Sequence, residues 1–208
     1  MRVLSAKIFV NYRRDDSASH AMNIAQYLEN AFGRENVFID VDRFKAGQHF
    51  PEVLADKVRS CNAMLVVIGP NWLNMRDPAT GSRRLDQPGD WVRLEIQAAL
   101  ARGICVIPIL VGGAKFPLKR DLPPELHSLY DRHHVVVTTS GFRYEMAGLA
   151  KDIAEVIGSP NSSPWNRRIM PIAFRLSIVA ALVGAIVSVG EYYLNRHRLA
   201  ADSGEGGQ

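Results

Sequence analysis

A single carboxylate stands on the apolar side of a predicted helix. Residues 89–103 read GDWVRLEIQAALARG, where the glycine–aspartate start supplies a cap and the final glycine can end the helix. At 100° per residue, Arg93 and Gln97 define the polar face, whereas Glu95 projects beside Trp91, inside the apolar arc. A carboxylate there is costly unless it is paired or lines a cleft. Glu95 is therefore the first candidate for a chemical role.

Two adjacent arginines follow the first predicted strand. The stretch NYRRDDS, residues 11–17, places Arg13 and Arg14 at a strand end, where two guanidinium groups can fork onto phosphate oxygens. The same arginines can instead pair with Asp15 and Asp16 in a solvated charge cluster. Position alone does not separate an anion-binding loop from a surface cluster, so both interpretations stay open.

The loop after the second predicted strand, FIDVDRFKAG, carries a weaker signal. Asp40 and Asp42 form a D-x-D pair, but no histidine or further carboxylate cluster supports a metal site. Phe44 and Lys45 can gate or line a cleft. We therefore predict a ligand-facing loop here and no metal centre.

The sequence disfavours several function classes. It lacks G-x-G-x-x-G after the first strand, a Walker loop and a G-x-S-x-G elbow, which argues against classical dehydrogenases, NTPases and hydrolases. A net charge of +4 is too weakly basic to indicate a nucleic-acid partner. Cys61 and Cys105 lie beside apolar runs and predict buried free thiols, because two cysteines at this spacing support neither a disulfide framework nor a zinc site.

Strand and helix signals alternate over the first 158 residues. Helices are expected from Asp16 or Ser17 to Phe32 and at 51–60, 89–103, 122–132 and 144–157. Strands are expected at 7–11, 36–40, 63–69, 104–110 and 133–139. This alternation predicts an α/β fold, a flavodoxin-like doubly wound five-stranded parallel sheet.

Such a sheet binds ligands beyond the carboxyl ends of its strands. The loops after Asn11, Asp40 and Gly69 therefore share one edge of the predicted sheet. The helix of Glu95 begins after the third of these loops, so Glu95 can face the same edge.

A hydrophobic segment lies near the end of the sequence. A polar linker at 159–168 leads to residues 169–194, whose central 15 residues between Arg175 and Glu191 are uncharged. With its flanks the segment is long enough to span a bilayer as a C-terminal hydrophobic helix, and the flanking charges favour a cytoplasmic N-terminal domain. A helix buried against a partner is the alternative. Residues 195–208 form a polar tail.

Four motifs in order resemble a Toll/interleukin-1 receptor (TIR) domain of the bacterial type. They are the first-strand box KIFVNYRRDDS, the second strand and so-called BB loop VFIDVDRFKAGQHF, the third strand AMLVVIGPNWL and the helix DWVRLEIQAAL. The resemblance covers residues 6–158, nearly the whole predicted domain 1–158, and excludes the hydrophobic segment.

The resemblance implies cleavage of NAD, as substrate and not cofactor, at its nicotinamide–ribose bond. Glu95, in a W-x-x-x-E pattern with Trp91, would be the catalytic carboxylate. One carboxylate suffices because nicotinamide is already a cation in NAD and leaves neutral, so no general acid is needed. The residues expected near the dinucleotide are Tyr12, Arg13, Arg14, Asp40, Phe44, Lys45 and Trp91.

The resemblance also implies self-association, with the active site completed by a neighbouring BB loop, and possible pairing with other TIR proteins. Many TIR domains are assembly modules without catalysis; Glu95 would then be a structural carboxylate, paired with Arg102 or an arginine of the first loop. A third class, a small flavodoxin-like receiver, fits the fold. Its acidic residues after the first strand are only partly matched, and no lysine follows Pro108.

Overall fold

The computed structural model describes residues 7–39 and 60–158. The chain divides into two units, Met1–Arg167 and Arg168–Gln208, and every described residue belongs to the first. The helix predicted at 51–60, apart from Ser60, lies outside the described residues, as do the linker 159–168, the hydrophobic segment 169–194 and the tail 195–208. Within 7–39 and 60–158, no helix is both long and apolar enough to cross a bilayer.

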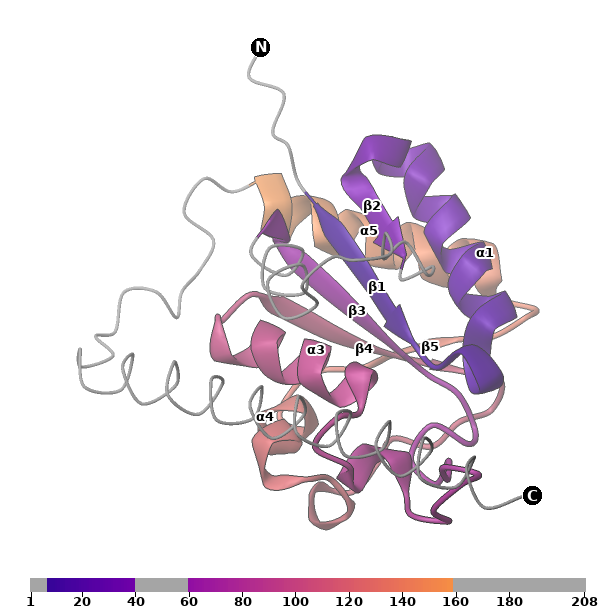
Figure 1. Cartoon of the computed structure of the whole chain (residues 1–208). Helices are drawn as coiled ribbons and strands as arrows, with labels where there is room; N and C mark the ends of the chain where they lie inside the picture. Colours follow the sequence, from indigo (N-terminus) through magenta and orange to yellow (C-terminus); the bar gives the residue numbers. More distant parts are fainter. Residues whose placement is uncertain (1–6, 40–59, 159–208) are drawn as a thin grey trace, which may run out of the picture. The chain divides into compact units, whose positions relative to one another are not determined.

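Five parallel strands form one sheet in the order β2-β1-β3-β4-β5 (Figure 1). This order is that of flavodoxin-like folds, so the predicted sheet is confirmed. Apolar runs build the strands, and β3 is buried at every residue. The strands are β1 Ile8–Tyr12, β2 Val37–Ile39, β3 Ala63–Ile68, β4 Cys105–Val111 and β5 Val135–Val137.

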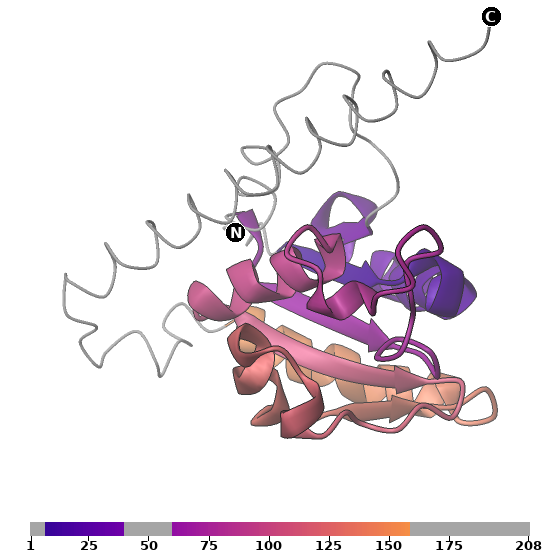
Figure 2. The same cartoon turned by 60° about the horizontal axis from the view of Figure 1, so that its bottom comes forward.

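Helices cover both faces of the sheet (Figures 1 and 2). On one face α1 (Arg14–Phe32) and α5 (Phe142–Gly158) share a core with strand residues, and α3 (Trp91–Ala101) packs over a second core on the other face. A single turn, α4 (His127–Tyr130), replaces most of the helix predicted at 122–132. Short 3-10 turns lie at Arg34–Asn36, Arg84–Asp86, Lys119–Asp121 and Pro124–Leu126.

The start of α1 differs from the prediction of a cap at Asp16 or Ser17. The helix begins at Arg14, because the Arg13 carbonyl already accepts hydrogen bonds from the backbone N–H groups of Asp16 and Ser17. The Asp16 carboxylate instead accepts a hydrogen bond from the Asn71 backbone N–H at 2.8 Å. It packs so closely on Gly69 that a Cβ there would collide with it. The predicted cap thus joins α1 to the loop after β3.

Alternation along β1 decides which side chains can meet α3. Ile8, Val10 and Tyr12 belong to the core under α1 and α5, whereas Phe9 belongs to the core under α3. Successive strand residues point to opposite faces, so Asn11 lies on the α3 face with Phe9. The carboxyl end of β1 therefore presents polar side chains to α3.

Candidate active site

Glu95 is buried in the second turn of α3, with only 4% of its surface exposed. The prediction that it sits within the apolar arc is confirmed, since Val92, Ile96 and Ala99 around it are also buried. The Asn11 side-chain amide donates a hydrogen bond to Glu95, with Nδ2 and Oε2 2.6 Å apart. Asn11 itself is fully buried. The carboxylate is thus held from the end of β1.

The helix that carries Glu95 is capped as the sequence predicts. The Asp90 side chain accepts a hydrogen bond from the Arg93 backbone N–H at 2.9 Å, and the helix runs from Trp91 to Ala101. An aspartate at this position satisfies one of the unpaired N–H groups of the first turn. The cap fixes where α3 begins and so places Glu95 in its second turn.

Arg13 binds Asp90 and does not present a free guanidinium. Its Nη1 and Nη2 donate to the two Asp90 carboxylate oxygens at 2.8 and 3.0 Å, and its Nε donates to the Trp72 carbonyl oxygen at 3.0 Å. Only 2% of Arg13 is exposed. This differs from both sequence interpretations, phosphate binding and pairing with Asp15 or Asp16. The physical reason is strand alternation, because Arg13 follows Asn11 onto the α3 face, where a desolvated cation needs a carboxylate.

Three further charged residues lie near Arg13 at this edge of the sheet. Arg14 is exposed at the first residue of α1. Asp15 pairs with Arg84, with 3.4 Å between Oδ2 and Nη1, and the Arg84 Nε lies 3.9 Å from Asp90 Oδ2. Arg84 was not among the predicted site residues, yet it adds a second cation beside Asp90.

The remaining predicted residues fall in three places. Trp91 is half-buried at the first residue of α3, on the same helix as Glu95. Tyr12 is buried in the core under α1 and α5, so its ring packs on the other face of the sheet from Glu95. Asp40, Phe44 and Lys45 lie outside the described residues.

Three buried polar atoms lack a hydrogen-bond partner among the described residues. They are Asn11 Oδ1, Asp16 Oδ2 and Trp72 Nε1. Asn11 is the fourth of five residues in β1, Asp16 lies four residues after β1, and Trp72 lies four residues after β3. These two neighbouring strands are where the strand order reverses. Crevices at such reversals are where open α/β sheets bind ligands. The unpaired atoms and Glu95 therefore mark one candidate site at the carboxyl ends of β1 and β3.

The predicted site residues did not include Asn11, Asp90 or Trp72, and for Trp72 core packing was preferred to stacking on a ligand ring. Asn11 carried a usable signal, since a polar residue in register with Phe9 occupies a core position of the strand. Asp90 was recognised only as a cap, and its pairing with Arg13 joins residues 77 apart in the sequence. Trp72 contributes the unpaired Nε1 and also its backbone oxygen, and no residue type can reveal a backbone contact.

The two cysteines are not activated nucleophiles. Burial raises the pKa of the Cys61 thiol, and burial also raises that of Cys105, so both are poor nucleophiles. Both are free thiols, as predicted, with Cys61 buried and Cys105 half-buried. Within the described ranges no group of three metal-ligating side chains comes together.

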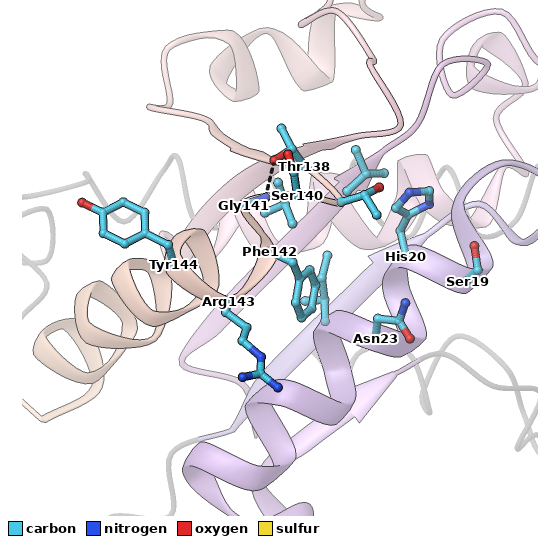
Figure 3. Close-up of a pocket in the computed structure, with 13 residues that line it drawn as sticks. Ser19, His20, Asn23, Thr138, Ser140, Gly141, Phe142, Arg143 and Tyr144 are labelled. Carbon is cyan, nitrogen blue, oxygen red and sulfur yellow. Dashed lines mark hydrogen bonds between the residues drawn. The ribbon is translucent and has the colours of Figure 1, made fainter.

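A separate hollow of about 620 Å³ lies between α1 and α5, at the ends of β4 and β5 (Figure 3). In Figure 3 the His20 ring points toward the loop after β5, while Tyr144 points away. No aspartate or glutamate lines it, so it cannot stabilise a developing cation as Glu95 can. Its lining is Ser19, His20, Asn23, Ile24, Val111, Val137, Thr138, Thr139, Ser140, Gly141, Phe142, Arg143 and Tyr144.

The strand order and the buried carboxylate define a flavodoxin-like α/β domain with an acidic site at its strand reversal. The TIR domain family model matches residues 8–151, and the chain belongs to this family.

Two curated relatives are similar in sequence. "NAD(+) hydrolase tir-1" of Caenorhabditis elegans is 28% identical over 166 residues, which is 79% of this chain and 16% of that protein. "NAD(+) hydrolase sarm1" of Drosophila melanogaster is 30% identical over 125 residues, 59% of this chain and 8% of that protein. The chain thus spans less than a fifth of the length of either relative.

Solved TIR structures are also similar. A metazoan TIR-STING receptor from C. gigas in complex with 2',3'-cGAMP gives a TM-score of 0.47 at 23% identity, covering 74% of this chain and 39% of that one. The TIR domain of the Toll-related receptor TRR-2 from Hydra magnipapillata gives 0.45 at 16% identity, covering 70% and 96%.

Proposed function

We propose that the chain is an NAD hydrolase that cleaves the nicotinamide–ribose bond, with Glu95 as the catalytic carboxylate. One observation carries the proposal: Glu95 is buried at the strand reversal and held by Asn11. A second support is the similarity of the chain to relatives named NAD(+) hydrolases, to which it is 28–30% identical over the matched residues.

The chemistry needs one negative charge near the reacting ribose. Nicotinamide departs as a neutral molecule, so the protein does not have to protonate a leaving group. The ribose left behind develops positive charge, and a preoriented carboxylate in a water-poor wall stabilises that charge strongly. Glu95 has this burial and this fixed orientation. The products would be nicotinamide and ADP-ribose or its cyclic form.

The binding groups are divided between the described domain and the loop after β2. Arg14, exposed at the start of α1, is the arginine that we assign to the diphosphate, because Arg13 is engaged with Asp90. Trp91 lies on the helix of Glu95 and is assigned to the wall of the cleft. From the family resemblance, Asp40, Phe44 and Lys45 complete the cleft.

We further propose that activity requires self-association and that residues 169–194 hold the domain on the cytoplasmic face of a membrane. The support for the anchor is that its 15 uncharged core residues, together with flanks in which Arg175 and Glu191 can snorkel and Tyr192 and Tyr193 suit an interface, are long enough to span a bilayer. Confinement to a surface raises the effective concentration of neighbouring domains and so favours their assembly. The output would be NAD depletion or a nucleotide signal, in a signalling or defence role.

The first test is the replacement of Glu95 by its isosteric amide. Glu95→Gln keeps the shape and one acceptor oxygen for Asn11 but removes the charge, and we expect kcat for NAD to fall by about 1,000-fold or more. Nicotinamide release by the purified full chain measures this, in dilute solution and crowded on lipid vesicles. Glu29→Gln, on α1 across the sheet, is the matched control and should keep full activity.

Two outcomes would contradict the proposal. Turnover by Glu95→Gln within a few-fold of wild type would remove Glu95 from the mechanism. No turnover by the wild type, even when crowded, would favour the second candidate function, a TIR–TIR assembly module in which the pairing of Glu95 with Asn11 is structural.

A further inference from the structure

We propose that Asn11 is a positioning residue for the reaction, which locks the Glu95 carboxylate in its working orientation. The inference rests on the proposed function and extends it to a residue on a different element. Asn11 sits at the fourth position of β1, and its amide donates to Glu95 Oε2 at 2.6 Å.

The anchor point is an interior strand of the sheet. β1 is hydrogen-bonded on both sides, to β2 and to β3, and Asn11 pairs in register with Val66. A short hydrogen bond to an ionised carboxylate is about twice as strong as a neutral one. The Asn11 amide cannot rotate by 180° without placing its oxygen against a carboxylate oxygen. The strand therefore fixes the direction in which Glu95 points.

The hydrogen-bonded pair of Asn11 and Glu95 is not explained by stability alone. Asn11 is fully buried, and its Oδ1 has no partner in the described part of the chain. An unpaired buried acceptor is destabilising, whereas an apolar pair of similar shape at these positions would be nearly neutral or stabilising. Because both atoms belong to one amide, the unpaired Oδ1 lies beside the carboxylate.

A second link prevents α3 from rotating around the first. Arg13, two residues after Asn11, holds both carboxylate oxygens of Asp90 at the cap of the same helix. Two anchors spaced along one strand thus meet two carboxylates spaced along one helix. With position and rotation of α3 both set, the remaining freedom of Glu95 is in its own side chain, and the Asn11 amide restrains it.

The kinetic test uses the full chain with Asn11→Ala. Misorientation of a catalytic group by a fraction of an ångström to 1 Å costs up to about 100-fold, so we expect kcat to fall about 10- to 100-fold with KM changed less than about threefold. The matched control is Asn36→Ala. Asn36 is also buried, donates to the Phe32 carbonyl at 2.7 Å and precedes β2 at its amino end, away from the site. It should lose stability without losing kcat.

A second measurement tests the hydrogen bond between Asn11 and Glu95 without measuring catalysis. Equilibrium unfolding of the full chain is compared for wild type, Asn11→Ala, Glu95→Ala and the double variant. If the two side chains are bonded, Asn11→Ala changes the unfolding constant at least about fivefold less in the Glu95→Ala background. Additive effects would overturn the link itself.

The two measurements separate the inference from the function on which it rests. Coupling together with unchanged kcat in Asn11→Ala would overturn the positioning role while leaving Glu95 catalytic. Coupling in a wild-type chain that never cleaves NAD would overturn the proposed function, and the positioning role with it. Coupling together with a selective loss of kcat is the expected result.

Discussion

At the scale of the residue, the end of β1 carries polar side chains where a core strand would carry apolar ones. Asn11 and Arg13 follow Phe9 on the face of α3, and each binds a carboxylate of that helix. Since Arg13 is buried and paired, replacing it should change the free energy of unfolding more than the affinity for NAD.

Arg13→Ala is expected to lower the free energy of unfolding by about 3–5 kcal/mol. Removing one partner of a buried ion pair leaves the other, Asp90, desolvated and unpaired. Arg84, whose Nε is 3.9 Å from Asp90, can compensate in part, which places the expectation at the lower end. Urea unfolding of the full chain measures the change.

The neighbouring Arg14 gives the control for this prediction. Arg14→Ala removes the same charge from an exposed position, so stability should change by less than about 0.5 kcal/mol, while KM for NAD should rise if Arg14 binds the diphosphate. Equal losses of stability in the two variants would show that Arg13 is not the buried anchor described above.

At the scale of the element, α3 was predictable because its signals are local. The aspartate cap, the 3.6-residue apolar period and the terminal glycine all lie within fifteen residues, and the helix forms between them. Likewise, continuous apolar runs located β3 and β4 within about one residue. The burial of Glu95 followed from the same periodicity.

The partners of these elements were not predictable, because the contacts are long-range. Asn11 and Glu95 are 84 residues apart, and the Asp16 carboxylate, predicted as a helix cap, accepts its hydrogen bond from the Asn71 backbone N–H, 55 residues away. From local sequence, two kinds of binding partner were predicted for Arg13, a phosphate group or the nearby aspartates. Only the assembled sheet brings Asp90 to it, from 77 residues away.

An ion pair in the loop between β3 and α3 is expected to make stability depend on pH. A hydrogen bond from Arg83 to Asp86, with Nε and Oδ2 2.8 Å apart, lowers the pKa of the Asp86 carboxyl below its ordinary value. Its contribution to stability is therefore present above the unfolded pKa and is lost as pH falls through the folded one. The pair is exposed, so Asp86→Asn should cost at most about 0.5 kcal/mol at pH 7.

Unfolding curves of wild type and Asp86→Asn between pH 3 and 7 measure this effect. The difference between them should start to shrink below about pH 4, where the carboxyl of the unfolded chain becomes protonated, and should be lost as pH falls through the lower folded pKa. It should also shrink in about 1 M salt, which screens exposed pairs. A difference that stays constant down to pH 3 would mean that Asp86 acts through packing instead of charge.

At the scale of the whole molecule, the described domain supplies the carboxylate, the cap and the strand anchor, but the proposed cleft also needs the loop after β2. The family resemblance assigns part of that cleft to a neighbouring copy. If the site is completed between copies, turnover per molecule must depend on how closely the copies lie. Residues 169–194 would then contribute to catalysis by confining the chain to two dimensions.

The full chain reconstituted into vesicles at a series of protein-to-lipid ratios tests this dependence. We expect NAD turnover per molecule to rise by about tenfold or more from sparse to dense vesicles, because a membrane-held neighbour has a much higher effective concentration than one in solution. Resistance to extraction at alkaline pH, measured on the same vesicles, checks that the segment spans the bilayer. Flat turnover across the series would mean that one copy holds the complete site, and chain released at alkaline pH would mean that the hydrophobic segment packs against protein instead of lipid.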